Sequence, residues 1–270
     1  MPSTERASAY EIFNSVIDNA REELSRSTRA LACSGLAAGL AMGLTGVGVA
    51  VAHVALGGSA QQFVPYLLYP VGFMVVIVGR QQLFTENTLY PVALVLDERR
   101  RQDVINTARL WVTVFVTNIV GAALFALLAG RGHALRPDAV HELVRLGAES
   151  TGRPYLDVFA SAIVGGWIIA LLAWLVTAAD WTIGHVAVVW VLAFVVGLGH
   201  FAHCIASSGE ILTGVWRGDI GLGSYGTWLA VATAGNIVGG IVIVTLLNFG
   251  QVTAGGERER RMTADPPQSA

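Results

Sequence analysis

The chain has 270 residues, of which 54% are hydrophobic and only 13% are charged. Soluble domains carry roughly 25% charged residues, so this composition excludes an ordinary soluble protein and indicates an integral membrane protein. The formal net charge of −2 argues against a nucleic-acid partner. Cys33 and Cys204 both lie in apolar stretches, so we expect no disulfide framework.

Residues 1–29 are polar, with apolar side chains at the spacing of one helical face. These apolar residues are Phe13, Val16, Ile17, Ala20 and Leu24. We expect an amphipathic N-terminal helix that lies against the membrane or the helix bundle. A solvated leader helix is the alternative. The segment lacks the apolar core of a signal peptide, so the first membrane span would direct insertion.

Six uncharged stretches follow, and each can supply one helix of the ~20 residues that cross a bilayer. They are residues 30–56, 63–79, 110–130, 158–179, 181–209 and 220–256. The sequence therefore predicts an all-α pore domain of six transmembrane helices over residues 30–249. Glycine and proline in residues 250–270 predict a disordered tail.

The second and fifth apolar segments are each too long for one span and are interrupted by polar residues. As a straight helix, the stretch from Phe63 to Leu96 would be ~50 Å long, against a hydrocarbon core of ~30 Å. Its polar cluster starts after Gly79, and the cluster in the fifth segment starts after Gly199. Broken helices at matching places in two three-span halves predict an inverted repeat with a site near the membrane midplane.

Arginines in the short connections predict the orientation, because positively charged loops stay in the cytoplasm. Eleven arginines lie on the side of both termini, whereas the opposite side has five, four of them in a loop over residues 131–153. We therefore expect a multi-pass protein of a bacterial inner membrane with both termini in the cytoplasm.

Two motifs at the breaks resemble those of the formate/nitrite transporter family. Leu83-Phe84-Thr85 resembles the loop that interrupts the second span, and the run from His203 to Ser207 resembles the histidine motif of the fifth. The resemblance covers residues 30–248. It implies an aquaporin-like protomer, a homopentamer with a pore through each protomer, and transport of small monovalent anions of weak acids.

The chain departs from that family's pattern around the histidine. Ala202 stands where the family has Glu, Ser207 stands where it has Asn, and Gly166 stands where the fourth span has Asn. The Lys before that span has no counterpart, since all 17 basic residues are Arg. The resemblance therefore implies a divergent branch.

His203 and Thr85 are the leading site candidates. Imidazole titrates near neutral pH, so His203 can offer charge or a proton to an anion in a narrow pore. The alternative is a neutral His that binds backbone freed by the helix break. Thr85 can bond an anion or the imidazole, or it can simply cap its loop. Ser207 and His200 are secondary candidates, with His200 expected in a vestibule or a structural role.

Three apolar side chains are candidates for the pore wall. We expect Leu83 to form a constriction, since apolar constrictions exclude hydrated ions. Phe84 is expected to pack against helices, and Phe73 could line the same pore.

Three charged residues lie at or near the breaks: Arg80, Glu86 and Glu210. They could pair with one another, cap helix ends, or replace the missing partners of His203. Because the two glutamates are placed alike in the two breaks, we favour structural pairing.

No metal, cofactor or enzymatic site is expected. The spacing of His200, His203, Cys204 and Glu210 matches no common zinc pattern. No nucleophile–base pair is visible either. The leading function is passive or proton-coupled transport of a small weak-acid anion. A channel for neutral small solutes and a non-transporting membrane scaffold are the alternatives.

Overall fold

The computed structural model of the protein describes residues 7–57, 63–179 and 181–254, and regular structure in these residues is entirely helical. The first half contains α1 (Ala9–Ser25), α2 (Thr28–Ala55), the 3₁₀ turns η1 (Val64–Leu68) and η2 (Glu86–Thr88), α3 (Pro70–Val78), α4 (Tyr90–Glu98) and α5 (Arg101–Gly130). The second half contains α6 (Pro137–Thr151), α7 (Tyr155–Thr177), α8 (Thr182–Leu198), α9 (Ala206–Arg217), α10 (Leu222–Val238) and the π-helix η3 (Gly239–Leu246).

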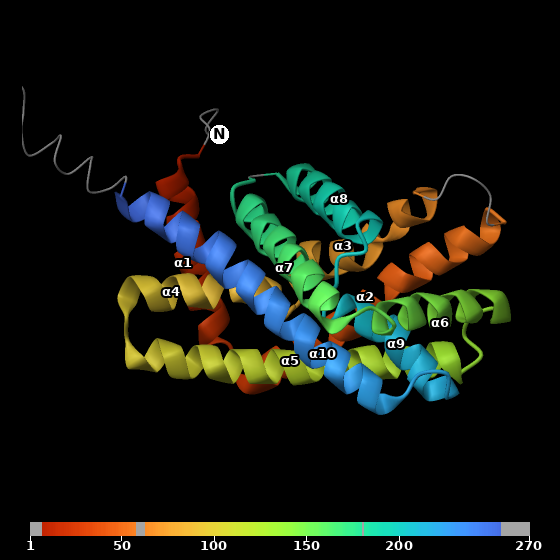
Figure 1. Cartoon of the computed structure of the whole chain (residues 1–270). Helices are drawn as coiled ribbons and strands as arrows, with labels where there is room; N and C mark the ends of the chain where they lie inside the picture. Colours follow the sequence, from red (N-terminus) through yellow and green to blue (C-terminus); the bar gives the residue numbers. More distant parts are fainter. Residues whose placement is uncertain (1–6, 58–62, 180, 255–270) are drawn as a thin grey trace, which may run out of the picture.

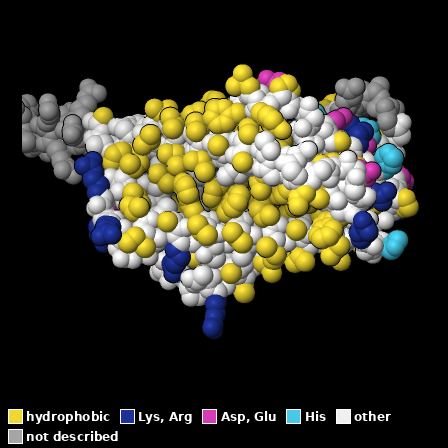
Figure 2. All heavy atoms as spheres, turned by 60° about the horizontal axis from the view of Figure 1, so that its bottom comes forward, with side chains coloured by type: hydrophobic (Ala, Val, Ile, Leu, Met, Phe, Trp, Pro, Cys, Tyr) yellow, Lys and Arg dark blue, Asp and Glu magenta, His cyan; other side chains and the backbone are white. Residues whose placement is uncertain are grey.

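Within the described residues, four helices are long and apolar enough to cross a bilayer: α2, α5, α7 and the continuous helix Leu222–Ala254 that contains α10 and η3. The pairs α3–α4 and α8–α9 form the two broken segments between them (Figure 1). On the face of Figure 2, hydrophobic side chains cover the middle, whereas arginines gather at one end and arginine, acidic and histidine side chains at the other. This is the surface of an all-α membrane protein.

Both breaks fall where the hydropathy pattern predicts them. The first short helix of each pair ends beside a glycine, Gly79 after α3 and Gly199 after α8. The next residues, Arg80 and His200, have φ angles of 52° and 50°. Left-handed backbone is uncommon outside glycine, and here it turns the chain out of the helix at both breaks.

Each half opens with an amphipathic helix. The buried face of α1 consists of the five apolar residues that the sequence predicts, and α1 packs mainly against α4 and also contacts α7 and α5. A second such helix, α6, stands where the sequence predicts a loop over residues 131–153. It packs against α9 and α2, which are the counterparts of α4 and α7. The repeat therefore comprises α1–α5 and α6–α10 rather than three spans alone.

The predicted boundary between pore domain and tail needs a smaller correction. The last helix continues to Ala254, so residues 250–254 are helical. The remainder of the predicted tail, like residues 1–6, lies outside the described part of the chain.

Glycines let the long helices of each half cross closely. A Cβ atom on Gly39 of α2 would lie 2.1 Å from the backbone oxygen of Asn118 on α5. One on Gly166 of α7 would lie 2.2 Å from the same atom of Asn236 on α10. Neither glycine can carry a side chain without moving backbone, so these crossings fix the two asparagines beside the breaks.

Candidate functional site

A buried asparagine holds the first break in place. The Asn118 amide nitrogen donates to the carbonyl oxygens of Gly35 and Gln82, at 2.8 and 2.9 Å. Its side-chain oxygen accepts the backbone N–H of Phe84 at 3.0 Å. One side chain thus satisfies two backbone groups that the break leaves without helical partners, the Gln82 carbonyl and the Phe84 N–H, and ties them to α2 through Gly35.

Asn236 holds the second break with the same three bonds. Its amide nitrogen donates to the carbonyl oxygens of Ala162 and Ala202, at 2.7 and 2.9 Å. Its side-chain oxygen accepts the N–H of Cys204 at 2.9 Å. The two halves therefore use equivalent anchors, as an inverted repeat requires.

A serine hydroxyl completes each anchor. Ser34 on α2 accepts the backbone N–H of Gln82, and Ser161 on α7 accepts that of Ala202, both at 3.0 Å. The sequence analysis missed both asparagines and both serines. The serines could have been identified from a pattern shared by the first and fourth spans, in which Ser34 and Ser161 are each followed by a small residue.

The two breaks meet at His203 and Thr85. The imidazole Nε2 lies 2.8 Å from the Thr85 hydroxyl oxygen. The ring of Phe73 on α3 stands edge-on to the imidazole, with centroids 5.2 Å apart. All three side chains have no solvent-exposed surface. The structure thus brings together three residues that the sequence predicts for the pore.

The hydrogen bonds of His203 fix the tautomer of its neutral form. Nδ1 accepts the backbone N–H of Ala206 at 3.0 Å, so its lone pair is occupied. A neutral imidazole carries its proton on the other nitrogen, and Nε2 therefore donates to Thr85. A second proton on Nδ1 would break the bond to Ala206. The pair can offer an N–H and a hydroxyl to a solute oxygen without carrying charge.

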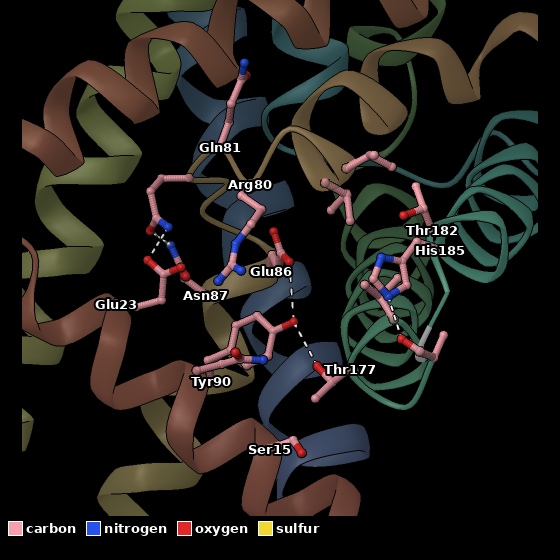
Figure 3. Close-up of a pocket in the computed structure, with 16 residues that line it drawn as sticks. Ser15, Glu23, Arg80, Gln81, Glu86, Asn87, Tyr90, Thr177, Thr182 and His185 are labelled. Carbon is pink, nitrogen blue, oxygen red and sulfur yellow. Dashed lines mark hydrogen bonds between the residues drawn. The ribbon is translucent and has the colours of Figure 1, made fainter. Parts of the chain in front are cut away.

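One cavity, of ≈ 370 Å³, lies on the α1 side of this pair. We call it the α1 vestibule (Figure 3). Its polar lining consists of Ser15, Asn19, Glu23, Arg80, Gln81, Gln82, Glu86, Asn87, Tyr90, Thr177, Thr182 and His185. Three of these, Gln82, Glu86 and Asn87, flank Thr85 in the chain, so the floor of the cavity lies next to the pair.

A second cavity, of ≈ 610 Å³, lies on the α6 side and is called the α6 vestibule. Its polar lining consists of Tyr66, Tyr69, Glu149, Ser150, Arg153, His200, Ser207 and Glu210. Two of its lining residues, Ala202 and Ser207, are close to His203 in the chain. The buried pair therefore separates two vestibules, one built from each end of the repeat.

Of the remaining predicted pore residues, some line a vestibule and others are packed inside the protein. Ser207 and His200 line the α6 vestibule, where His200 Nε2 lies 3.2 Å from the Tyr66 hydroxyl. Phe84 packs edge-on against Phe115, with centroids 4.9 Å apart. Leu83 is fully buried and lines neither cavity. Its role as a constriction remains a prediction.

The expected pairing among the three charged residues is wrong. Arg80 pairs with Glu22 of α1 at 3.1 Å. Glu86 reaches only the Tyr90 hydroxyl, at 3.5 Å, and the carboxylate of Glu210 has no ion pair or hydrogen bond within the described ranges. The two glutamates are also not equivalent. Counted from the anchored residues Gln82 and Ala202, they lie one helical turn apart.

Arg153 was not predicted as a site residue. It lies just before α7, and its guanidinium donates to the His200 carbonyl at 3.0 Å and to the Ser161 hydroxyl at 3.4 Å. It places a positive charge in the α6 vestibule beside the second break. A basic residue directly before Pro154 and an apolar span was the available signal.

Comparisons with known proteins agree with this architecture. The formate/nitrite transporter family matches residues 10–250. Inner membrane protein YfdC of Escherichia coli is 31% identical over 258 residues, covering 95% of this chain and 83% of that protein. A probable formate transporter of Methanothermobacter thermautotrophicus is 28% identical over 228 residues, covering 73% and 80%.

Solved structures show the same fold. An FNT family ion channel matches with a TM-score of 0.73 at 18% identity, covering 87% of this chain and 96% of the channel. A pentameric formate channel with formate bound matches with a TM-score of 0.64 at 19% identity, covering 85% and 96%.

Proposed function

Because the chain belongs to the formate/nitrite transporter family, we propose that it moves a small monovalent weak acid, such as formate or nitrite, across the membrane. The observation that carries this proposal is the buried His203–Thr85 pair between two vestibules. Two donors enclosed by apolar side chains suit one small oxygen-bearing solute. Without them, removing a polar group from water costs several kcal/mol, roughly 2–7.

The proposed path begins at either vestibule. A solute oxygen displaces Thr85 as the acceptor of the His203 N–H, and the Thr85 hydroxyl donates to it as well. Phe73 stays in contact with the imidazole and keeps water out. Because the neutral His203 carries no charge to balance an anion, the solute crosses this point as the undissociated acid. Transport is therefore proton-linked and electrically silent.

Flux measurements in proteoliposomes test this function. Labelled formate should enter vesicles without a current, and His203→Ala should remove most of the flux. Thr85→Val keeps the shape but loses the hydroxyl, so the rate should fall about tenfold, the equivalent of one hydrogen bond. Ser150→Ala, at the rim of the α6 vestibule, is the matched control. Absence of formate flux in the unmodified protein would reject the proposal.

A channel for neutral solutes is the second candidate. The neutral tautomer of His203 and the carboxyl groups in both vestibules favour it. Water or formamide flux that exceeds formate flux at every pH, and that survives His203→Ala, would select this function instead.

The proposal also covers the orientation of the protein in the membrane and its oligomeric state. Arginines concentrate on the α1 side, where the described residues include Arg21, Arg26, Arg99, Arg100 and Arg101, so this side is assigned to the cytoplasm. A homopentamer is proposed by analogy with the pentameric formate channel of the same fold. Native mass spectrometry of the purified protein tests the assembly, and labelling of Cys33 from one side of sealed vesicles tests the orientation.

A further inference from the structure

We infer that Glu86 and Glu210 are the proton-carrying residues of the pathway, one in each vestibule. This inference rests on the proposed function, because it assigns the source of the proton that the weak acid needs. His203 does not supply this proton in its neutral form, since Nδ1 is occupied and loss of the Nε2 proton would leave an anionic ring. The donor must therefore lie elsewhere along the path.

Glu86 lies in the floor of the α1 vestibule, directly after Thr85 (Figure 3). Its carboxyl group has one hydrogen bond, the 3.5 Å contact with Tyr90. The single Tyr90 proton has a closer acceptor, the carbonyl oxygen of Ala173 at 3.2 Å. The tyrosine oxygen is then free to accept a hydrogen bond from Glu86, which fits a protonated carboxyl group.

The charged groups that face Glu86 do not neutralise it. They are Glu23 of α1 and Arg80 at the end of α3. Arg80 forms its ion pair with Glu22, and Glu23 adds a second negative charge. In the described part of the chain, therefore, no cation pairs with Glu86. A carboxyl group in this position is stabilised by holding a proton.

Glu210 on α9 lines the α6 vestibule, one helical turn beyond the position that corresponds to Glu86. It is only 8% exposed, and its Cγ and Oε1 lie against Gly46 of α2, where a Cβ would approach within 2.7 and 2.9 Å. Arg145 and Glu149 of α6 face it, and Arg153 and His200 line the same vestibule, where Arg153 donates to the His200 carbonyl and His200 contacts Tyr66. Arg145 is engaged by Glu142 and Glu149.

The two carboxyl groups give a balanced cycle. In the α6 vestibule, the Glu210 O–H bond breaks and its proton bonds to the arriving anion, which yields the neutral acid and the Glu210 carboxylate. The acid crosses between Phe73, Thr85 and His203. In the α1 vestibule, Glu86 has released its own proton to water, so its carboxylate takes the proton of the acid, which leaves as the anion. Water then supplies a proton to Glu210 in the α6 vestibule, so one proton moves with each anion.

The experiment compares Glu86→Gln and Glu210→Gln in proteoliposomes, with formate uptake measured over a series of external pH values. Glutamine keeps the shape and hydrogen-bonding capacity but carries no exchangeable acid proton. We expect each variant to slow formate uptake about tenfold or more and to flatten its increase at low pH. Glu86→Asp and Glu210→Asp should recover part of the rate, since aspartate retains the proton. Size-exclusion chromatography verifies folding.

The matched controls are Asp18→Asn on α1 and Asp138→Asn on α6, which alter exposed, ion-paired carboxylates that line neither vestibule. Their rates should stay close to the unmodified rate. If the buried carboxylates only repel anions, their Gln variants will be faster, which overturns the inference. Unchanged rates, or Asp variants as slow as the Gln variants, also overturn it. Absence of formate flux in the unmodified protein would instead reject the proposed function.

Discussion

In the first half of the molecule, the segment after the break presents Glu86 of η2 and Tyr90 of α4 to its vestibule; in the second half, the equivalent positions hold Ala206 and Glu210 of α9. The hydrogen bonds that hold the two breaks are nevertheless the same. The repeat therefore preserves the bonds that satisfy the backbone and varies the side chains that meet the solute. The carboxyl group that follows each break, Glu86 or Glu210, lies one helical turn further along the chain in the second half.

The largest expected effect comes from removing the anchors that the halves share. Asn118→Ala and Asn236→Ala each leave two buried backbone groups of a break unpaired, so each should cost roughly 2–6 kcal/mol of stability. Thermal unfolding of the purified protein in detergent measures the loss. Asn106→Ala, at the partly exposed start of α5, is the control and should change little. A large loss in only one half would contradict the equivalence of the anchors.

Closely packed glycines should give the next largest effect. A methyl group on Gly39 or Gly166 meets backbone oxygen, so either alanine variant should lose about 1–3 kcal/mol. Gly226→Ala on α10 meets open space and should instead gain up to about 1 kcal/mol in helix propensity. The same melting measurement separates the two classes. Equal changes in stability for all three variants would show that the helix crossings are not tightly packed.

The serine anchors should reveal a difference between the halves. Ser34 accepts one backbone N–H, whereas Ser161 also donates to the His200 carbonyl at 3.3 Å and receives a bond from Arg153. We expect Ser161→Ala to cost about 2 kcal/mol and Ser34→Ala about 1. The order of the two melting temperatures checks this. If Ser34→Ala lowers the melting temperature more, the serine of the first half contributes more to stability, which contradicts the prediction.

The two amphipathic helices should respond to pH in opposite directions, with the smallest effects. Burial raises the pKa of Glu23 on α1, so its folded form holds a proton that the unfolded chain has lost. Docking of α1 should therefore weaken as pH rises above about 4.5. Burial opposes the charge on Glu142 of α6 too, but hydrogen bonds from Arg145 together with the nearby positive charges outweigh it and lower its pKa. Docking of α6 should weaken as pH falls below that value.

Hydrogen exchange of α1 and α6 over a pH series measures both responses. Correction for the intrinsic pH dependence of exchange comes from Glu23→Gln and Glu142→Gln, which should remove the respective response. Parallel trends in the two helices would contradict the prediction.

Local sequence predicted the breaks and the central pair because both depend on local chemistry. A polar cluster inside an apolar segment needs a cavity or protein partners, and the motifs around Thr85 and His203 carry the family resemblance. The buried face of α1 was equally readable from its helical spacing. In α6, similar spacing is mixed with arginine and acidic residues, so the segment was interpreted as a loop.

Pairings between distant elements could not be predicted in the same way. The partner of Arg80 is Glu22, on a helix whose docking position is set by tertiary packing. The apparent equivalence of Glu86 and Glu210 came from counting along each polar cluster. The correct alignment depends on the bonds of Asn118 and Asn236, which exist only in the folded protein.

The π-helix η3 determines which side of the last described helix faces α1. Wider turns accommodate one extra residue, which rotates all later residues of that helix by about 100° relative to a regular α-helix. Its counterpart α5 has no such shift. The added rotation brings Phe249 to Phe13 of α1, with ring centroids 5.9 Å apart. The last described helix is thus phased to meet the first, and deletion of one residue from Gly239–Leu246 would turn that contact toward lipid.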